Sequence, residues 1–365
     1  MSRVASLIAD RSLLVTAGPG GVGKTTTAAA IGLAGARAGR RVIVMTVDPA
    51  RRLAEALGLD PEQADEPHRV DDAGVDGGEL WTLMLDSSAT FDRLIVSQAG
   101  SPERAQRILD NPVYQAISRS LGGAQEYMAI ERLHELFTSG EWDLVVVDTP
   151  PSRHALDLLE APDRLNSFLG HPVYRALTAG QRAFAKVTNA AASAFLWAVK
   201  RLAGPQIVED TLEFFRSITT LEPGLRRRSK EVATLLRDEA TSFVVVTSPR
   251  AEALDEARHL VDGLRRGSFP FGALVANLVH PLPPALPDDG TLEPPYGDAL
   301  AQQLDWHHEL RSLALAEREV LTTVTEAVAG DVDVIELELR DRDITDLDGL
   351  AAFADNLVAD RSDPR

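Results

Sequence analysis

The first residues with recognisable chemistry form the glycine-rich run GPGGVGKT at positions 18–25. This run satisfies the phosphate-binding pattern G-x-x-x-x-G-K-[ST], the P-loop, at every fixed position. Backbone N–H groups at a helix N-terminus would surround a β-phosphate, Lys24 would bridge the β- and γ-phosphates, and Thr25 would bind Mg²⁺. The residues predicted to bind the nucleotide in this run are Gly20, Gly21, Val22, Gly23, Lys24, Thr25 and Thr26.

Two carboxylates end apolar runs and are candidates for metal binding and catalysis. Asp148 follows LVVV, where a P-loop protein places the acidic residue that holds the Mg²⁺ shell. Asp48 ends the run that follows the P-loop helix, and a carboxylate there could orient or deprotonate an attacking water. Each has a plainer alternative: Asp148 as a strand-end cap, and Asp48, followed by Pro49, as the start of a turn.

These residues need a framework of alternating strands and helices. Residues 13–16, 24–38 and 41–47 predict a strand, an alanine-rich helix and a second strand, which form one βαβ unit with the P-loop at its first turn. A fully apolar strand such as 144–147 is typical of a parallel sheet covered on both faces. We further expect strands at 80–85, 243–246, 273–276 and 332–339, and helices at 251–266, 297–328 and near the end.

The domain organisation follows from two long helical stretches inside this framework. We expect an α/β core of the P-loop NTPase class, with a mainly parallel, helix-covered sheet, built from residues 1–86, 141–154 and 240–365. Residues 87–140 and 155–239 would form an inserted helical subdomain. Only one glycine loop occurs, so one nucleotide site is expected per chain.

Composition excludes one class of partner. The 365 residues carry a formal net charge of −18, and this field would repel a nucleic acid backbone. The local basic run at 226–230 is expected to be a solvated helix face. With 44% hydrophobic and 25% charged residues, the chain has a globular composition.

The chain has no cysteine, which rules out disulfides and thiolate metal sites. The first residues lack the pattern of a secretory leader, and the longest apolar run, 190–199, is shorter than the ~20 residues of a spanning helix. A cytoplasmic protein without direct membrane insertion is therefore expected.

Four segments together resemble the ArsA-type ATPases, the family of arsenical pump-driving ATPases and ATPases that target tail-anchored membrane proteins. They are GPGGVGKTTTAAA, VMTVDPARRLAEALG, VVVDTPPSRHALDLLE and GALVANLVHP, and the similarity extends over most of the chain. The chain is identified as a cysteine-free bacterial member. The resemblance implies ATP hydrolysis at a dimer interface, with Asp48 aligning the water, Asp148 holding the metal shell and Asn277 contacting adenine. On its residue type alone, an asparagine that ends a strand, such as Asn277, is more often a turn residue.

Position 19 departs from the family pattern, because Pro19 stands where the family has a lysine that reaches the partner's ATP. Three interpretations stay open. The chain pairs with a paralogue that carries the lysine; or Arg51 or Arg52 supplies the charge; or the site is a slow nucleotide switch with negligible turnover. The first is favoured because Lys24, Thr25 and both aspartates are present. The missing cysteines also exclude thiolate binding of arsenite and a CxxC zinc clasp.

We therefore expect a Mg-dependent ATPase that acts as a nucleotide-gated homodimer or heterodimer and handles a partner or a hydrophobic protein client. The alternative is a non-catalytic ATP-binding subunit of a heterodimer. Some apolar residues of the helical stretch could line a client groove, although core packing is the commoner role of such residues. They are Phe184, Val187, Phe195, Leu196, Trp197 and Val199.

Overall fold

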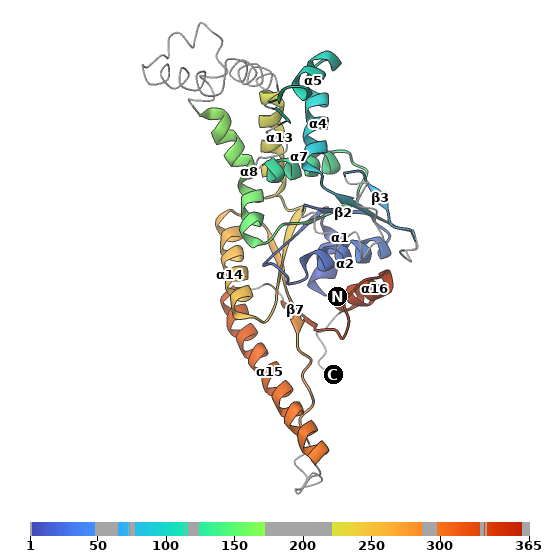
Figure 1. The fold of residues 1–365 in the computed structure, drawn as a ribbon, viewed down its shortest axis with the longest axis vertical. Coiled ribbons are helices and arrows are strands. Elements are labelled where there is room, and N and C mark those ends of the chain that lie inside the picture. The colour runs from blue at the N-terminus through green and yellow to red at the C-terminus, as the bar shows by residue number, and fades with distance from the viewer. Residues whose placement is uncertain are drawn as a thin grey trace.

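The computed structural model describes residues 2–47, 65–71, 73, 77–112, 114–115, 124–171, 221–286, 298–328, 332 and 334–359. Within these residues the chain forms an α/β fold around one sheet (Figure 1). The strands are β1 (Leu13–Ala17), β2 (Arg41–Thr46), β3 (His68–Arg69), β4 (Glu79–Met84), β5 (Leu144–Asp148), β6 (Thr241–Thr247), β7 (Phe271–Val279) and β8 (Val334–Glu338). The fold class predicted from the sequence is confirmed.

The sheet has the order β3-β4-β2-β5-β1-β6-β7-β8. All neighbouring strands are parallel except β3, which runs antiparallel to β4. Asp148 pairs in register with Thr16 of β1 on one side and with Thr46 of β2 on the other. The carboxyl ends of three adjacent strands therefore coincide, and the loops that follow them meet at one edge of the sheet.

One face of the sheet is covered by α1 (Arg3–Asp10), α2 (Lys24–Arg37) and α16 (Leu347–Val358). Helix α2 is rich in alanine and threonine and is buried along most of its length. A helix that is apolar on nearly all sides must lie between two layers, and α2 lies between the sheet and α16. This burial fixes the direction in which α2 leaves the P-loop.

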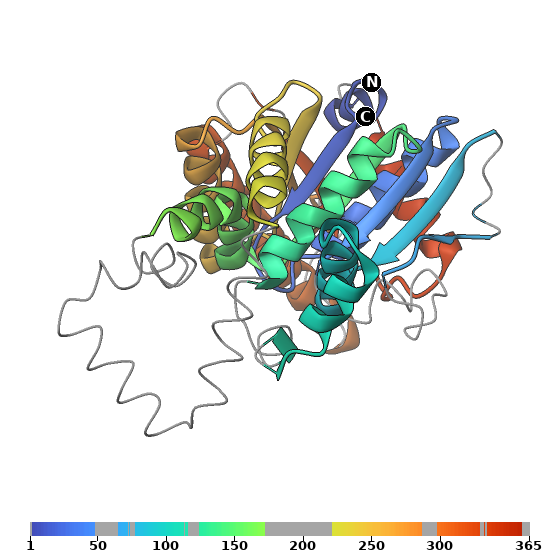
Figure 2. The ribbon, with the colours of Figure 1, turned by 90° about the horizontal axis from the view of Figure 1, so that it is seen from above.

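The other face is covered by α7 (Ala124–Thr138), α8 (Ser152–Gly170), α13 (Glu222–Leu235) and α14 (Ala251–Arg266). Helix α4 (Ser87–Gln98) packs on α7 from outside, and α5 (Pro102–Leu109) packs on α4, around a separate apolar cluster (Figure 2). We call α4, α5, α7, α8 and α13 the helical layer.

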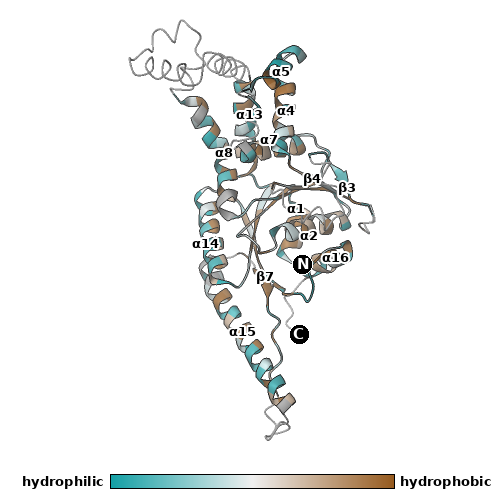
Figure 3. Ribbon diagram, viewed as in Figure 1, coloured by the Kyte–Doolittle hydropathy of each residue, from teal (hydrophilic) through white to brown (hydrophobic). Residues whose placement is uncertain are grey.

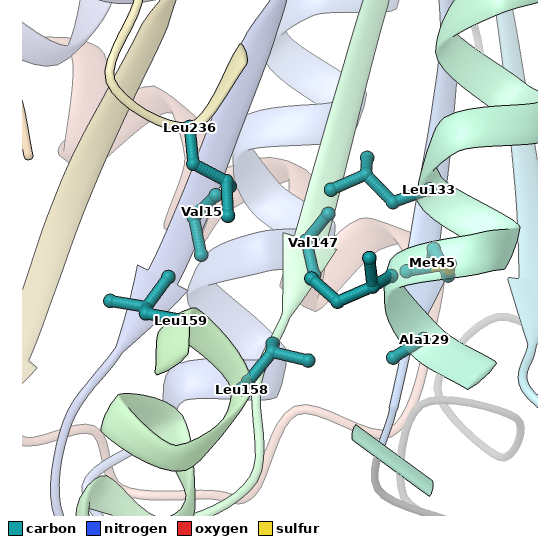
Figure 4. A pocket seen from close by; sticks show the side chains of 9 residues that line it. Val15, Met45, Ala129, Leu133, Val147, Leu158, Leu159 and Leu236 are labelled. Carbon is teal, nitrogen blue, oxygen red and sulfur yellow. The ribbon is translucent and has the colours of Figure 1, made fainter. Parts of the chain in front are cut away.

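A small apolar hollow lies between the helical layer and the sheet (Figure 4). It is lined by Val15, Met45, Ala129, Ile130, Leu133, Val147, Leu158, Leu159 and Leu236. None of these side chains can bind a phosphate or a metal ion, so the hollow is part of the packed core.

Helix α15 (Asp298–Val328) extends away from the sheet, with polar and apolar residues alternating along it (Figure 3). No helix of the described residues is both long enough and apolar enough to span a bilayer.

The helices and strands expected from the sequence are present where the structure describes them, with three differences. Helix α1 was not expected; it begins after Ser2, whose side chain accepts a hydrogen bond from the N–H of Ala5. Strand β3 lies in what was expected to be a loop. Strand β7 continues to Val279, past the expected end at 276.

The expectation of a solvated basic face at 226–230 is wrong for its middle. Arg228 is 7% exposed and Ser229 is fully buried. The guanidinium of Arg228 forms an ion pair with Glu131 of α7 at 2.5 Å. A buried carboxylate 97 positions away overrides the sequence rule that a run of charges faces solvent.

Candidate functional site

The P-loop leaves the end of β1 and enters α2, as predicted, and two of its glycines are required by geometry. A Cβ at Gly18 would lie 2.0 Å from the carbonyl oxygen of Val246 in β6. Gly23, the N-cap of α2, has φ of 89°, which L-residues rarely adopt. A Cβ there would also lie 2.4 Å from Nδ2 of Asn277. The loop is therefore held against its neighbours as closely as a backbone allows.

The predicted catalytic lysine is held inside the loop. Lys24 is 7% exposed, and its Nζ donates a hydrogen bond to the carbonyl oxygen of Pro19 at 2.7 Å. Pro19 is itself buried. The ammonium group therefore lies on the inner side of the loop, where a β-phosphate would bind.

A hydroxyl and a carboxylate meet at the carboxyl ends of the strands. Thr25 Oγ1 donates to Oδ2 of Asp148 at 2.7 Å, and Thr46 Oγ1 donates to the same oxygen at 3.0 Å. Asp148 is fully buried. Hydroxyl and carboxylate oxygens are the donors that Mg²⁺ prefers, so Thr25 and Asp148 fit the metal position predicted for them. We call residues 18–25, Thr46 and Asp148 the P-loop edge.

Thr46 was not among the predicted site residues. The signal that could have identified it is its place at the end of β2, in register with Asp148. After it, the N–H of Val47 donates to the carbonyl oxygen of Asp148 at 3.0 Å. Strands β2 and β5 are thus tied together at the point where the chain enters residues 48–64.

Asn277 lies inside β7 rather than at its end, which corrects the expected strand boundary and the turn alternative. Its side chain is 5% exposed and donates from Nδ2 to the carbonyl oxygen of Val22 at 2.9 Å. The next residue, Leu278, has φ of 62°, and the pairing with β8 shifts register there. This irregularity of the strand lets Asn277 face the P-loop. Its predicted contact with adenine stays a prediction.

Several predicted residues belong to parts of the chain that the structure does not describe. Asp48, Arg51 and Arg52 lie outside the described residues, as do the six apolar residues considered for a client groove. Within the described part of the chain, no group of three or more acidic or histidine side chains could hold a metal ion. Nucleotide phosphates and water would supply further oxygens to a Mg²⁺ ion at the P-loop edge.

Comparison with known proteins identifies relatives over most of the chain. Residues 11–285 match the family described as anion-transporting ATPase, ArsA_ATPase. The chain is 29% identical to ATPase GET3B of Arabidopsis thaliana over 304 residues, which cover 76% of this chain and 66% of the relative.

Two further relatives are bacterial. The chain is 30% identical to the uncharacterized protein SCO2128 of Streptomyces coelicolor, with 83% of this chain and 71% of the relative covered. It is 24% identical to putative arsenical pump-driving ATPase 2 of Aquifex aeolicus, with coverage of 72% and 79%. The match spans only 66% of the Arabidopsis protein and 35% of another relative, ATPase ARSA1 of Chlamydomonas reinhardtii. Both relatives are therefore longer proteins than this chain.

Proposed function

The chain belongs to the ArsA family of anion-transporting ATPases, and from that premise we propose that it binds Mg-ATP at the P-loop edge and hydrolyses it to ADP and phosphate. The observation that supports this most is the 2.7 Å hydrogen bond between Thr25 and Asp148. It joins the hydroxyl that follows the P-loop lysine to the carboxylate at the end of β5. These are the two residue types that hold Mg²⁺ in P-loop NTPases.

The roles of the protein groups follow from their positions. Backbone N–H groups of residues 20–24 would bind the phosphates at the N-terminus of α2. Lys24 would exchange its bond to Pro19 for bonds to phosphate oxygens. Thr25 and Asp148 would hold Mg²⁺, which neutralises charge on the β- and γ-phosphates when bound. Asp48 would orient the attacking water and accept its proton.

Asn277 has a double role in this proposal. Its Nδ2 is already used to hold Val22, so its Oδ1 is the atom left to accept a bond from the exocyclic amino group of adenine. One side chain would then both support the P-loop and contact the base.

Position 19 bears on the oligomeric state. Because Pro19 is buried and uncharged, it presents no cation to a neighbouring subunit. We propose a nucleotide-gated dimer in which a paralogue supplies the missing lysine to this subunit's ATP. A homodimer would instead require Arg51 or Arg52 as the cation, or would be a slow switch.

The experiment that tests the proposed activity is steady-state ATP hydrolysis by the purified chain, alone and mixed with a lysine-bearing paralogue. Asp48→Asn is the matched control, because it keeps the size of the side chain and removes the base. The proposal expects turnover that Asp48→Asn abolishes while Mg-ATP still binds. Equal turnover by the wild type and by the Asp48→Asn protein would contradict the proposal.

A second candidate function is a non-catalytic subunit that uses ATP to hold a dimer together, and the buried Pro19 is what favours it. It predicts Mg-ATP-dependent dimerisation with no turnover in any pairing, which analytical ultracentrifugation and the hydrolysis assay together would reveal.

Handling of a hydrophobic client is a separate proposal, based on the family and on the helical layer. It predicts that a hydrophobic helical peptide is captured by the chain and released on addition of ATP.

A further inference from the structure

Three polar side chains form a row across the centre of the sheet. Thr46 of β2 and Thr16 of β1 lie in register with Asp148 of β5, one on each side of it. On all three strands, the residue two positions earlier belongs to the apolar core between the sheet and α2. Because the side chains of a strand alternate between its two faces, the row points to the face that α2 covers. Asp148 therefore lies between two threonines, on the side of the sheet where α2 begins.

The two threonines use their hydroxyls differently. Thr46 Oγ1 donates to Oδ2 of Asp148 at 3.0 Å, whereas Thr16 Oγ1 donates to the carbonyl oxygen of Val147 at 3.3 Å. Both threonines are buried, Thr46 with 2% of its surface exposed and Thr16 with none. The pair is therefore matched in residue type, burial and register, and differs in whether the hydroxyl bonds the carboxylate.

The backbone around Asp148 is fixed toward both neighbouring strands. The carbonyl oxygen of Asp148 accepts a hydrogen bond from the N–H of Val47 at 3.0 Å. The next residue, Thr149, donates from its N–H and from its hydroxyl to the carbonyl oxygen of Thr16, at 3.2 and 2.8 Å. With the backbone held in this way, rotation about the side-chain bonds of Asp148 decides where its carboxylate points.

Thr46 is well placed to set that rotation. Its strand pairs with β4 on one side and with β5 on the other, and its carbonyl oxygen accepts the N–H of Leu85 at 3.0 Å. A β-branched side chain has few rotamers, so its hydroxyl has a defined direction. Thr25, which donates to the same oxygen of Asp148 at 2.7 Å, is the residue expected to bind Mg²⁺. The hydroxyl of Thr25 would turn toward the ion, whereas Thr46 can keep its bond.

We propose that Thr46 is a positioning residue for Mg²⁺, whose hydroxyl holds the carboxylate of Asp148 in the orientation that binds the ion. Carboxylates that bind metals are themselves held by hydrogen bonds from outside the metal shell, and loss of such a partner costs about 10- to 100-fold in metal affinity or activity. This inference deepens the proposed binding of Mg-ATP at the P-loop edge and rests on it.

The test uses Thr46→Val, which keeps the shape of the side chain and removes its hydroxyl. The matched control is Thr16→Val, which removes a buried hydroxyl from the same row and leaves the bond between Thr46 and Asp148 in place. Thr46→Ser keeps the hydroxyl, and Thr46→Ala is a second variant without it. For each protein, fluorescence titration gives the Kd of a labelled ATP analogue in Mg²⁺ and in EDTA, and a thermal melt checks the fold.

We expect the wild type to bind the analogue about tenfold more tightly in Mg²⁺ than in EDTA. Thr46→Val and Thr46→Ala should lose most of this difference, because a fall of about tenfold in metal affinity offsets it. Their Kd in EDTA should stay that of the wild type, since the P-loop itself is unchanged. Thr16→Val and Thr46→Ser should keep the full difference between Mg²⁺ and EDTA.

Three results would contradict this expectation. Full Mg²⁺ dependence in Thr46→Val would overturn the inference and leave the proposed metal site of Thr25 and Asp148 standing. An equal loss of Mg²⁺ dependence in Thr16→Val or in Thr46→Ser would also overturn it, because the hydroxyl on Asp148 would then not be the cause. A wild type whose affinity does not respond to Mg²⁺ would contradict the proposed function, and the inference with it.

Discussion

The P-loop edge and the helical layer both contain buried polar groups, but these groups are held by different interactions. At the P-loop edge, neutral hydroxyls of Thr25 and Thr46 share one carboxylate oxygen, and glycines allow backbone to approach backbone. In the helical layer, whole charges are buried in pairs, such as Glu131 with Arg228. A site that must admit a phosphate and a cation needs groups that can exchange partners, whereas a buried ion pair resists rearrangement once formed. We therefore expect changes to the polar side chains of the edge to act mainly on activity, and changes in the layer to act mainly on stability.

The largest effect is expected at Lys24. Lys24→Ala removes the cation that would stabilise the transferring phosphoryl group, and turnover should fall on the order of a thousandfold. The midpoint of thermal unfolding should change by only a few degrees. Steady-state hydrolysis and a thermal melt measure the two effects; activity within tenfold of the wild type would break the comparison.

The next largest effect is expected in the helical layer. Glu131→Ala leaves Arg228 buried without its carboxylate, which should lower the free energy of unfolding by about 3 kcal/mol. Urea unfolding measures this loss. The control is Arg226→Ala, which removes a more exposed pair with Glu222 and should cost about 0.5 kcal/mol. Equal losses in the two variants would show that burial of the pair is not what matters.

Two glycines with similar backbone angles sharpen the description of the edge. Gly23→Ala strains a left-handed residue and forces a Cβ against Asn277, so we expect a loss of about 2 kcal/mol and weaker Mg-ATP binding. Gly39→Ala strains a residue with φ of 86° but has open space around it, so it should cost only about 1 kcal/mol. Urea unfolding and nucleotide titration separate strain from crowding. No difference between the variants would mean that crowding against Asn277 adds nothing to the cost of the strained backbone.

The smallest effect compares helix caps on the two faces of the sheet. Asp86 caps α4 in the helical layer, and Asp346 caps α16 on the other face. Replacing either by alanine should cost about 1 kcal/mol in urea unfolding, if the chain unfolds as one unit. A much smaller cost for Asp86→Ala would instead show that the helical layer unfolds separately.

The same contrast explains what the sequence could predict. The P-loop, the strands beside it and the position of Asp148 are local features, because a strand ending in aspartate or leading into GPGGVGKT leaves its pattern within a few residues. Their meeting at one edge follows from the rule that parallel strands align their carboxyl ends.

The polar contacts of the helical layer could not be predicted in this way. Arg228 lies in a basic run that is typical of a solvated helix, and only the position of Glu131 in the fold explains its burial. Asp65 likewise gives no local signal that two arginines from different helices approach it. Asn277 was assigned to the end of a strand because the strained backbone at Leu278 is not encoded in any short pattern.

The most direct test of the central claim is the Mg²⁺ dependence of nucleotide binding in Asp148→Asn. The assay is fluorescence titration with a labelled ATP analogue, in Mg²⁺ and in EDTA. We expect the wild type to bind about tenfold more tightly with Mg²⁺, and Asp148→Asn to lose this difference but keep the affinity seen in EDTA. If Asp148→Asn retains the full Mg²⁺ dependence, then the pair formed by Thr25 and Asp148 is not the metal site, and the proposed mechanism is wrong.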